Sequence, residues 1–225
     1  MPTPLKYKAP FLAEAFYHIV CKSIDGILLF RDPKDYGVFL ERFMQFNSPF
    51  LLVWSYSLLS NHTHFVVKVA SLKAIRAYLE GENKLQKTVA MNCFLKDTEN
   101  EKLLDEMLER QMNSFLVSYA TYYNNRYNRK GGLFQKPFKR IEIMDDAYLQ
   151  QAIIYTNANA QKHKLVRDFA NYPYASYQDV MQDRNAWIVV NDVIDFFGSK
   201  EKFEALHKVQ VDYYYKNNWP SSKLE

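Results

Sequence analysis

The chain has 225 residues and a net charge of only +4, so a basic surface would have to come from clustering rather than from bulk composition. Hydrophobic residues at 48% and charged residues at 24% describe an ordinary globular protein with an ample core. Two cysteines exclude a disulfide scaffold and a cysteine-rich zinc framework, and no apolar run approaches the length of a membrane span. We therefore expect a cytoplasmic protein with no membrane partner.

The first third of the chain predicts a strand, a helix and a hairpin. Residues 16–30 have the composition of a strand, a break at Asp25-Gly26 and a second short extended piece. Asp32-Pro33 is typical of an N-cap followed by proline at the first helical position, and the apolar spacing over 34–46 predicts the helix. Two β-rich runs then meet at Ser60-Asn61, which predicts a hairpin.

The middle of the chain predicts two more helices, a strand and another helix. A short helix is expected over 71–79, and the polar stretch 82–101 is expected to be a loop or insertion. A long helical pattern covers 102–127, an alternating strand pattern covers 138–144, and a helix follows over 147–163. The order strand, helix, strand, strand, helix, strand predicts an α+β fold, a ferredoxin-like split β-α-β antiparallel sheet with helices on one face and a C-terminal helical extension.

The second run of the hairpin opens with His62-Thr63-His64. Because strand side chains alternate between faces, both imidazoles should point the same way, about 7 Å apart along the strand. Two imidazoles on one face can bind a single metal ion. The alternative is a pair of ordinary half-buried histidines. Thr63, Phe65, Val67 and Val69 would share the opposite face, which has the composition of a core.

Tyr155 and Asn159 are four residues apart in the last predicted helix of this region and therefore share a face. The Asn carbonyl can serve as a third ligand for Mg²⁺ or Mn²⁺, and the phenol would then lie beside the metal. Attack of the Tyr155 hydroxyl on a phosphate would give a phosphotyrosine. The chain contains seventeen Tyr, however, and an aromatic residue on a helix face is usually part of the core.

A basic segment with interleaved aromatic residues lies between these two groups. Residues 122–140 contain six Lys or Arg and no acidic residue. Such charges neutralise phosphates, and flat rings stack on bases, as single-stranded nucleic acid requires. The alternative is a solvated helix end with the aromatic rings turned inward. The candidate DNA-binding residues are Arg126, Arg129, Lys130, Lys136, Lys139 and Arg140.

Together these stretches resemble the single-tyrosine HUH transposases, in particular the REP-associated tyrosine transposases and their insertion-sequence relatives. The matching stretches are FYHIVCKSIDG with FRDPKDYGVFLERF, WSYSLLSNHTHFVV, YNNRYNRKGGLFQKPFKR, DDAYLQQAIIYTNANAQKHKLV and YPYASY. They run in the family's order over roughly residues 14–178. The chain departs from the family pattern at Ala160, at Lys164 and at Cys21-Lys22.

The resemblance implies that His62, His64 and Asn159 bind Mg²⁺ or Mn²⁺ and that Tyr155 is the nucleophile. The implied activity is cleavage and strand transfer of single-stranded or hairpin DNA through a 5′-phosphotyrosine, carried out by a monomer or homodimer. Residues 1–165 would form the catalytic domain and 166–225 a C-terminal helical extension. Two alternatives remain: a catalytically silent DNA-binding regulator, and a metal-dependent phosphohydrolase that uses water.

Overall fold

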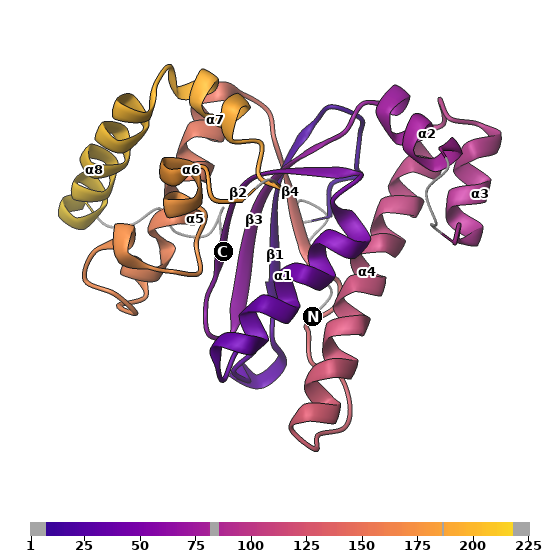
Figure 1. The fold of residues 1–225 in the computed structure, drawn as a ribbon, viewed down its shortest axis with the longest axis horizontal. Coiled ribbons are helices and arrows are strands. Elements are labelled where there is room, and N and C mark those ends of the chain that lie inside the picture. The colour runs from indigo at the N-terminus through magenta and orange to yellow at the C-terminus, as the bar shows by residue number, and fades with distance from the viewer. Residues whose placement is uncertain (1–7, 82–85, 186, 218–225) are drawn as a thin grey trace.

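The computed structural model describes residues 8–81, 86–185 and 187–217 as a four-stranded antiparallel sheet with helices packed around it (Figure 1). The strands are β1 Phe16–Lys22, β2 Leu51–Leu58, β3 His62–Val69 and β4 Lys139–Ile143. The α-helices are α1 Pro33–Asn47, α2 Leu72–Glu80, α3 Val89–Lys96, α4 Glu101–Arg126, α5 Asp146–Lys162, α6 Tyr177–Gln182, α7 Val190–Phe197 and α8 Lys200–Asn217. Short 3₁₀ turns occupy Ile24–Gly26 and Phe169–Asn171.

The sheet has the order β2-β3-β1-β4 and pairs antiparallel throughout, as a split β-α-β fold requires. The predicted hairpin joins β2 to β3, and β3 is a central strand between β2 and β1. The predicted helix start is confirmed as well. The Asp32 side chain accepts hydrogen bonds from the backbone N–H groups of Lys34 and Asp35, with Pro33 at the first helical position.

One face of the sheet is covered by α1 and α4. Phe65 of β3 stacks on Phe43 of α1 at 4.3 Å between ring centroids, and Phe115 of α4 contacts the same ring at 5.4 Å. These residues are fully buried and belong to the main hydrophobic core. The face that carries Phe65, Val67 and Val69 is therefore core, as the alternation predicts.

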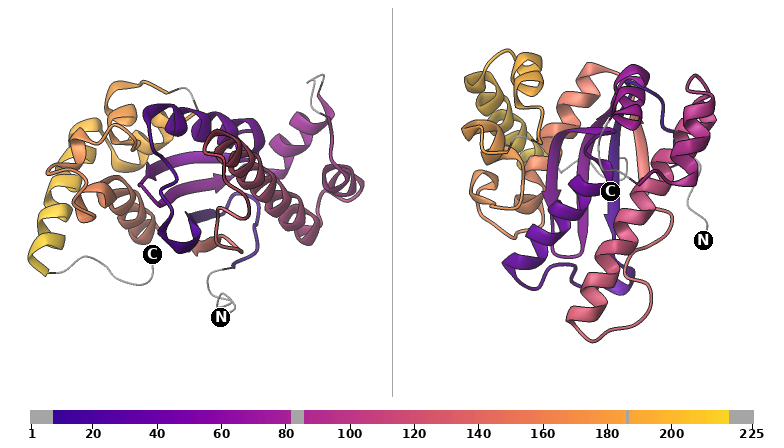
Figure 2. Two further views of the ribbon diagram at one scale, coloured as in Figure 1. Left: turned by 90° about the horizontal axis from the view of Figure 1, so that it is seen from below. Right: turned by 45° about the vertical axis from the view of Figure 1, so that its right-hand side comes forward.

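The opposite face is covered by α5, so the prediction of helices on one face only is wrong. The ring of Tyr155 lies 5.9 Å from that of His64, which points away from Phe65. Residues 152–160 of α5 are all buried, because this helix lies between the sheet and the C-terminal helices. Figure 2 shows α1 and α4 on one side of the sheet and α5 with the C-terminal helices on the other.

The segment after residue 165 packs against α5 and β2 and extends the same hydrophobic core. The hydroxyl of Ser176 donates to the side-chain oxygen of Asn157 in α5 at 2.7 Å. The hydroxyl of Tyr56 in β2 donates to the Asp179 carboxylate at 2.7 Å. The boundary at residue 165 stays a prediction. These contacts tie the C-terminal segment to both α5 and β2.

A second correction concerns residues 82–101, which the sequence predicts to be an irregular loop or insertion. Residues 82–85 lie outside the described residues, but α3 occupies Val89–Lys96 within this stretch. The Thr88 side chain accepts a hydrogen bond from the Met91 backbone at 3.3 Å and caps the helix. Within the described residues no helix is long and apolar enough to cross a membrane.

Candidate metal and nucleophile site

His62 and His64 project from β3 toward α5. Their ring centroids are 5.0 Å apart, and both side chains are buried. The register pairs His64 with Val20 and His62 with Lys22 of β1, so these four side chains share one face of the sheet. The structure thus brings the two imidazoles together on the face that the alternation predicts for them.

Helix α5 brings Tyr155 and Asn159 onto the same pair of histidines. The Tyr155 ring lies against His64, and the His163 ring, just after the helix, lies 5.0 Å from His62. Asn159 is one helical turn from both Tyr155 and His163, so it lies on the same side of α5 as these two residues. Its side chain is fully buried. Of the four residues that the sequence predicts to form one site, the ring contacts bring His62, His64 and Tyr155 together. Asn159 follows Tyr155 by one turn on the same helix, and the roles of all four stay predictions.

Several polar atoms at this point have no hydrogen-bond partner within the described residues. They are the side-chain oxygen Oδ1 and nitrogen Nδ2 of Asn159 and the Nε2 atom of His64. Burying a polar group without a partner costs about 1–3 kcal/mol. Such groups in a folded protein call for an explanation, and a missing water or ion is a common one.

The Nδ1 atoms of His62 and His64 each lie within hydrogen-bond distance of a neighbouring side chain. His62 Nδ1 lies 2.7 Å from the Asn61 side-chain oxygen, an acceptor, so Nδ1 carries the proton and Nε2 is left with a lone pair. His64 Nδ1 lies 2.9 Å from Nε2 of His18 on β1. Metal-binding histidines are usually oriented in this way by a partner at the other nitrogen.

The imidazoles of His64 and His18, both buried near the centre of the sheet, are neutral. Burial lowers the pKa of His64 well below its ordinary value, and the nearby His18, His62, His163 and Lys162 lower it further. Burial also lowers the pKa of His18 to about 3. Neutral imidazole is the form that binds a metal.

The donor set fits a divalent cation only if Asn159 takes part. Within the described chain, no group of three or more His, Cys, Asp or Glu side chains is arranged to hold a metal ion. Two imidazoles with one amide oxygen would leave several positions for water or phosphate oxygens, as suits Mg²⁺ or Mn²⁺. The unpartnered atoms of Asn159 and His64 are consistent with this set.

Tyr155 is fully buried, and its hydroxyl oxygen accepts a hydrogen bond from the Lys162 ammonium at 2.8 Å. The same ammonium lies 4.9 Å from the centre of the ring. The rings of His18 and His64 each meet the Tyr155 ring edge to face. The phenol is thus held by a cation next to the histidine pair.

The predicted basic segment divides into paired and unpaired cations. Arg140 is only 2% exposed and pairs with Asp105 at 2.9 Å and Glu109 at 3.2 Å. The prediction of a DNA contact is therefore wrong for Arg140 in this fold, because the guanidinium lies in the interior. Arg126 is exposed but forms ion pairs with Asp32 and Asp35 of α1.

The other four predicted DNA-binding residues lie in or beside the loop between α4 and β4. Arg129 donates to the backbone carbonyls of Gly131 and Gly132 and so shapes the loop. Lys139 is half-buried. Lys130 and Lys136 are exposed and, in the described part of the chain, form no ion pair.

The loop lies at the same end of the sheet as His62. The Gln135 N–H donates to the Lys22 carbonyl at 2.8 Å, and the Ile24 N–H donates to the Leu133 carbonyl at 3.0 Å. Lys22 is exposed and is the register partner of His62. The sequence analysis did not identify Lys22, His18, Lys162 or His163 as site residues. Only strand register and helix placement bring them to the histidine pair.

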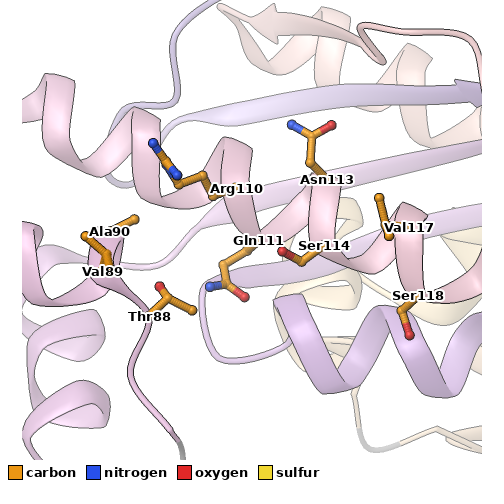
Figure 3. Close-up of a pocket in the computed structure, with 9 residues that line it drawn as sticks. All are labelled: Thr88, Val89, Ala90, Arg110, Gln111, Asn113, Ser114, Val117 and Ser118. Atoms are coloured by element: carbon orange, nitrogen blue, oxygen red, sulfur yellow. The ribbon is translucent and has the colours of Figure 1, made fainter.

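A separate groove of about 570 Å³ lies between α3 and α4 (Figure 3). Its lining contains one charged side chain, Arg110, and no histidine or carboxylate. The residues around it are Thr88, Val89, Ala90, Arg110, Gln111, Asn113, Ser114, Val117 and Ser118. This groove lacks the groups needed for acid–base or metal chemistry.

No family model and no curated protein matches the chain. A solved structure described as the REP-associated tyrosine transposase bound to a REP hairpin is similar, with a TM-score of 0.50 and 11% sequence identity. The likeness covers 84% of this chain and 92% of that chain. At this identity the likeness shows the fold alone. By fold, then, the chain is similar to the REP-associated tyrosine transposases, the family that its motifs resemble.

Proposed function

We propose that the protein cleaves single-stranded DNA and rejoins strands through a covalent bond to Tyr155. The observation that carries the proposal is the packing of the Tyr155 ring of α5 against His64 of β3, next to His62, with Asn159 one turn further along the same helix. The similar fold, which is described for a tyrosine transposase bound to a hairpin, supports DNA as the partner. A DNA partner also fits the cytoplasmic location expected from the sequence.

In the proposed reaction, His62, His64 and Asn159 would hold Mg²⁺ or Mn²⁺. A divalent cation bound there would offset the negative charge on the oxygens of a DNA phosphate. The Tyr155 hydroxyl oxygen forms a new P–O bond as the bond between phosphorus and the 3′ oxygen of the leaving strand breaks. The phenol loses its proton, and the 3′ oxygen gains one.

This step exchanges one phosphodiester for another, so it consumes neither water nor ATP. A 3′-hydroxyl of a second strand can reverse it and release Tyr155. Lys162 donates to the phenol oxygen and would stabilise negative charge that develops there. The exposed Lys130 and Lys136 are placed to contact the phosphate backbone, because their loop adjoins the sheet end at Lys22.

The test is a denaturing gel for a protein–DNA adduct. Purified protein is incubated with Mg²⁺ or Mn²⁺ and a pool of labelled single strands, each with a hairpin flanked by randomised segments. Tyr155→Phe removes only the hydroxyl, so cleavage and adduct should vanish together while DNA binding remains. Tyr148→Phe, a half-buried tyrosine on the same helix, is the matched control and should cleave normally.

The other outcomes select the alternatives. An adduct that persists in Tyr155→Phe assigns the nucleophile to another tyrosine. Cleavage by the wild type without an adduct identifies a phosphohydrolase that uses water. Binding without cleavage identifies a silent DNA-binding regulator, a candidate favoured by one observation: Tyr155 has no exposed surface.

A further inference from the structure

A third histidine, His18 of β1, lies behind the histidine pair. Its Nε2 atom is 2.9 Å from Nδ1 of His64, and the two rings are nearly parallel, at 12° with centroids 5.1 Å apart. Both side chains are fully buried. We propose that His18 is a positioning residue that accepts a hydrogen bond from Nδ1 of His64 and thereby directs Nε2 of His64 to the metal. This inference rests on the proposed function, since it requires the metal site.

The argument follows from counting protons. Each neutral imidazole carries one ring proton, and only one of the two facing nitrogens can carry it. If Nε2 of His18 donated, the proton of His64 would sit on its own Nε2, and no lone pair would remain for a metal. If Nδ1 of His64 donates, Nε2 of His64 keeps its lone pair. Metal binding is therefore possible in only one of the two arrangements.

In either arrangement the same two nitrogens, Nε2 of His64 and Nδ1 of His18, are left without a partner in the described chain, and a metal on Nε2 of His64 would satisfy one of them. In the proposed arrangement the remaining proton of His18 would sit on its Nδ1 atom. An apolar side chain would fill this position without leaving such an atom, so the imidazole of His18 needs a reason beyond packing.

His18 also contacts the proposed nucleophile. The rings of His18 and Tyr155 meet edge to face at 6.4 Å, so one side chain adjoins both His64 and Tyr155. His18 stands two residues before Val20, the register partner of His64, and this places it diagonally to His64 on the same face of the sheet. A substitution at His18 would therefore act on the metal site through His64, without removing a ligand.

The experiment measures Co²⁺ binding by visible absorption, because Co²⁺ binds imidazole sites more tightly than Mn²⁺ and reports its ligand field. His18→Leu fills the space without an acceptor, whereas the side-chain oxygen of His18→Gln can accept from Nδ1 of His64. We expect His18→Leu to weaken Co²⁺ binding by about 10–100-fold and His18→Gln to stay within a few-fold of the wild type. Circular dichroism and thermal unfolding establish that both variants are folded.

A second readout does not depend on any variant. Long-range ¹H–¹⁵N correlation spectra of the wild type with Zn²⁺ bound should show the proton of His64 on Nδ1. A proton on Nε2 of His64, or unchanged Co²⁺ affinity in folded His18→Leu, overturns the proposal for His18. A wild type that binds no Co²⁺, or binds it equally well as His64→Ala, overturns the metal site itself and with it the role of His18.

Discussion

The Lys162 ammonium lies 2.8 Å from the hydroxyl oxygen of Tyr155 and covers part of its ring. Both residues belong to α5 and are seven positions apart. The Tyr155 side chain has no exposed surface. Lys162 therefore both orients the hydroxyl and places a positive charge next to the oxygen on which negative charge would develop.

We expect Lys162→Met to reduce strand cleavage by about 100-fold, because one charge-assisted donor to the reacting oxygen is lost. Lys162→Arg, which keeps a cationic donor, should retain most of the rate. Lys164→Met is the matched control, since Lys164 is exposed and two residues further along. Single-turnover cleavage of a labelled strand measures the effect. Faster cleavage by Lys162→Met would instead identify Lys162 as a restraint on the nucleophile.

The double variant Lys130→Ala, Lys136→Ala should bind single-stranded DNA more weakly and with a flatter salt dependence. Each phosphate contact contributes about 0.7 to the slope of log affinity against log salt, so losing two reduces the slope by about 1.4. Fluorescence anisotropy over a salt series gives both quantities. Lys202→Ala, Lys208→Ala removes the same charge from α8 and should leave the slope unchanged. Equal slopes for all three proteins would show that the loop is only solvated surface.

Arg140→Met should lower the free energy of unfolding by about 2 kcal/mol or more and leave the salt slope of DNA binding intact. The guanidinium is buried between β4 and α4, and its removal leaves the carboxylates of Asp105 and Glu109 without their partner. Urea unfolding followed by circular dichroism measures the loss. A normal unfolding midpoint together with weaker DNA binding would restore Arg140 to the DNA-binding residues.

His207 predicts a pH dependence of stability that is independent of the metal site. Burial lowers the pKa of His207 to about 4, and its ring is held by the Phe203 carbonyl at 2.7 Å and by Asn157 at 3.0 Å. In the unfolded chain an ordinary histidine takes up a proton below about pH 6.5, whereas folded His207 does not until about pH 4. The free energy of unfolding therefore falls as pH drops through this interval.

His207→Gln removes the titratable imidazole and keeps a side-chain oxygen that can accept the hydrogen bond from Asn157. Urea unfolding at several pH values should show the slope between pH 6.5 and 4 reduced by up to about 1.4 kcal/mol per pH unit. Above pH 7 the stability of wild type and variant should run parallel. An unchanged slope between pH 6 and 5 would mean that His207 is protonated in the folded protein.

Local patterns predicted much of the fold. The Asp32-Pro33 start, the hairpin at Ser60-Asn61 and the alternation of β3 each depend on neighbouring residues, and the structure agrees with them. The short helix α3 was missed because its apolar face is brief and its cap, Thr88, stands in a polar stretch. The position of α5 was missed although 152–160 contains no charged residue, a composition typical of a helix covered on both sides.

The candidate site was only half predictable, because the remaining half depends on contacts between distant parts of the chain. His62 with His64, and Tyr155 with Asn159, follow from spacings of two and four. His18 reaches His64 only through the register of β1 and β3. Arg126 and Arg140 form part of a segment without acids, but their carboxylate partners come from 31 to 94 positions away. Counting local charge therefore overestimated the cationic surface.

The buried amide of Asn157 ties α5 to its surroundings, since its oxygen accepts from Ser176 and Ser55 and its nitrogen lies against His207 of α8. A helix fastened in this way both to β2 and to the C-terminal helices cannot swing away from the sheet without exposing all of these groups. We therefore expect Tyr155 to serve the histidines of its own chain. Two copies mixed together, one lacking the hydroxyl and the other lacking His64, should not restore each other's cleavage.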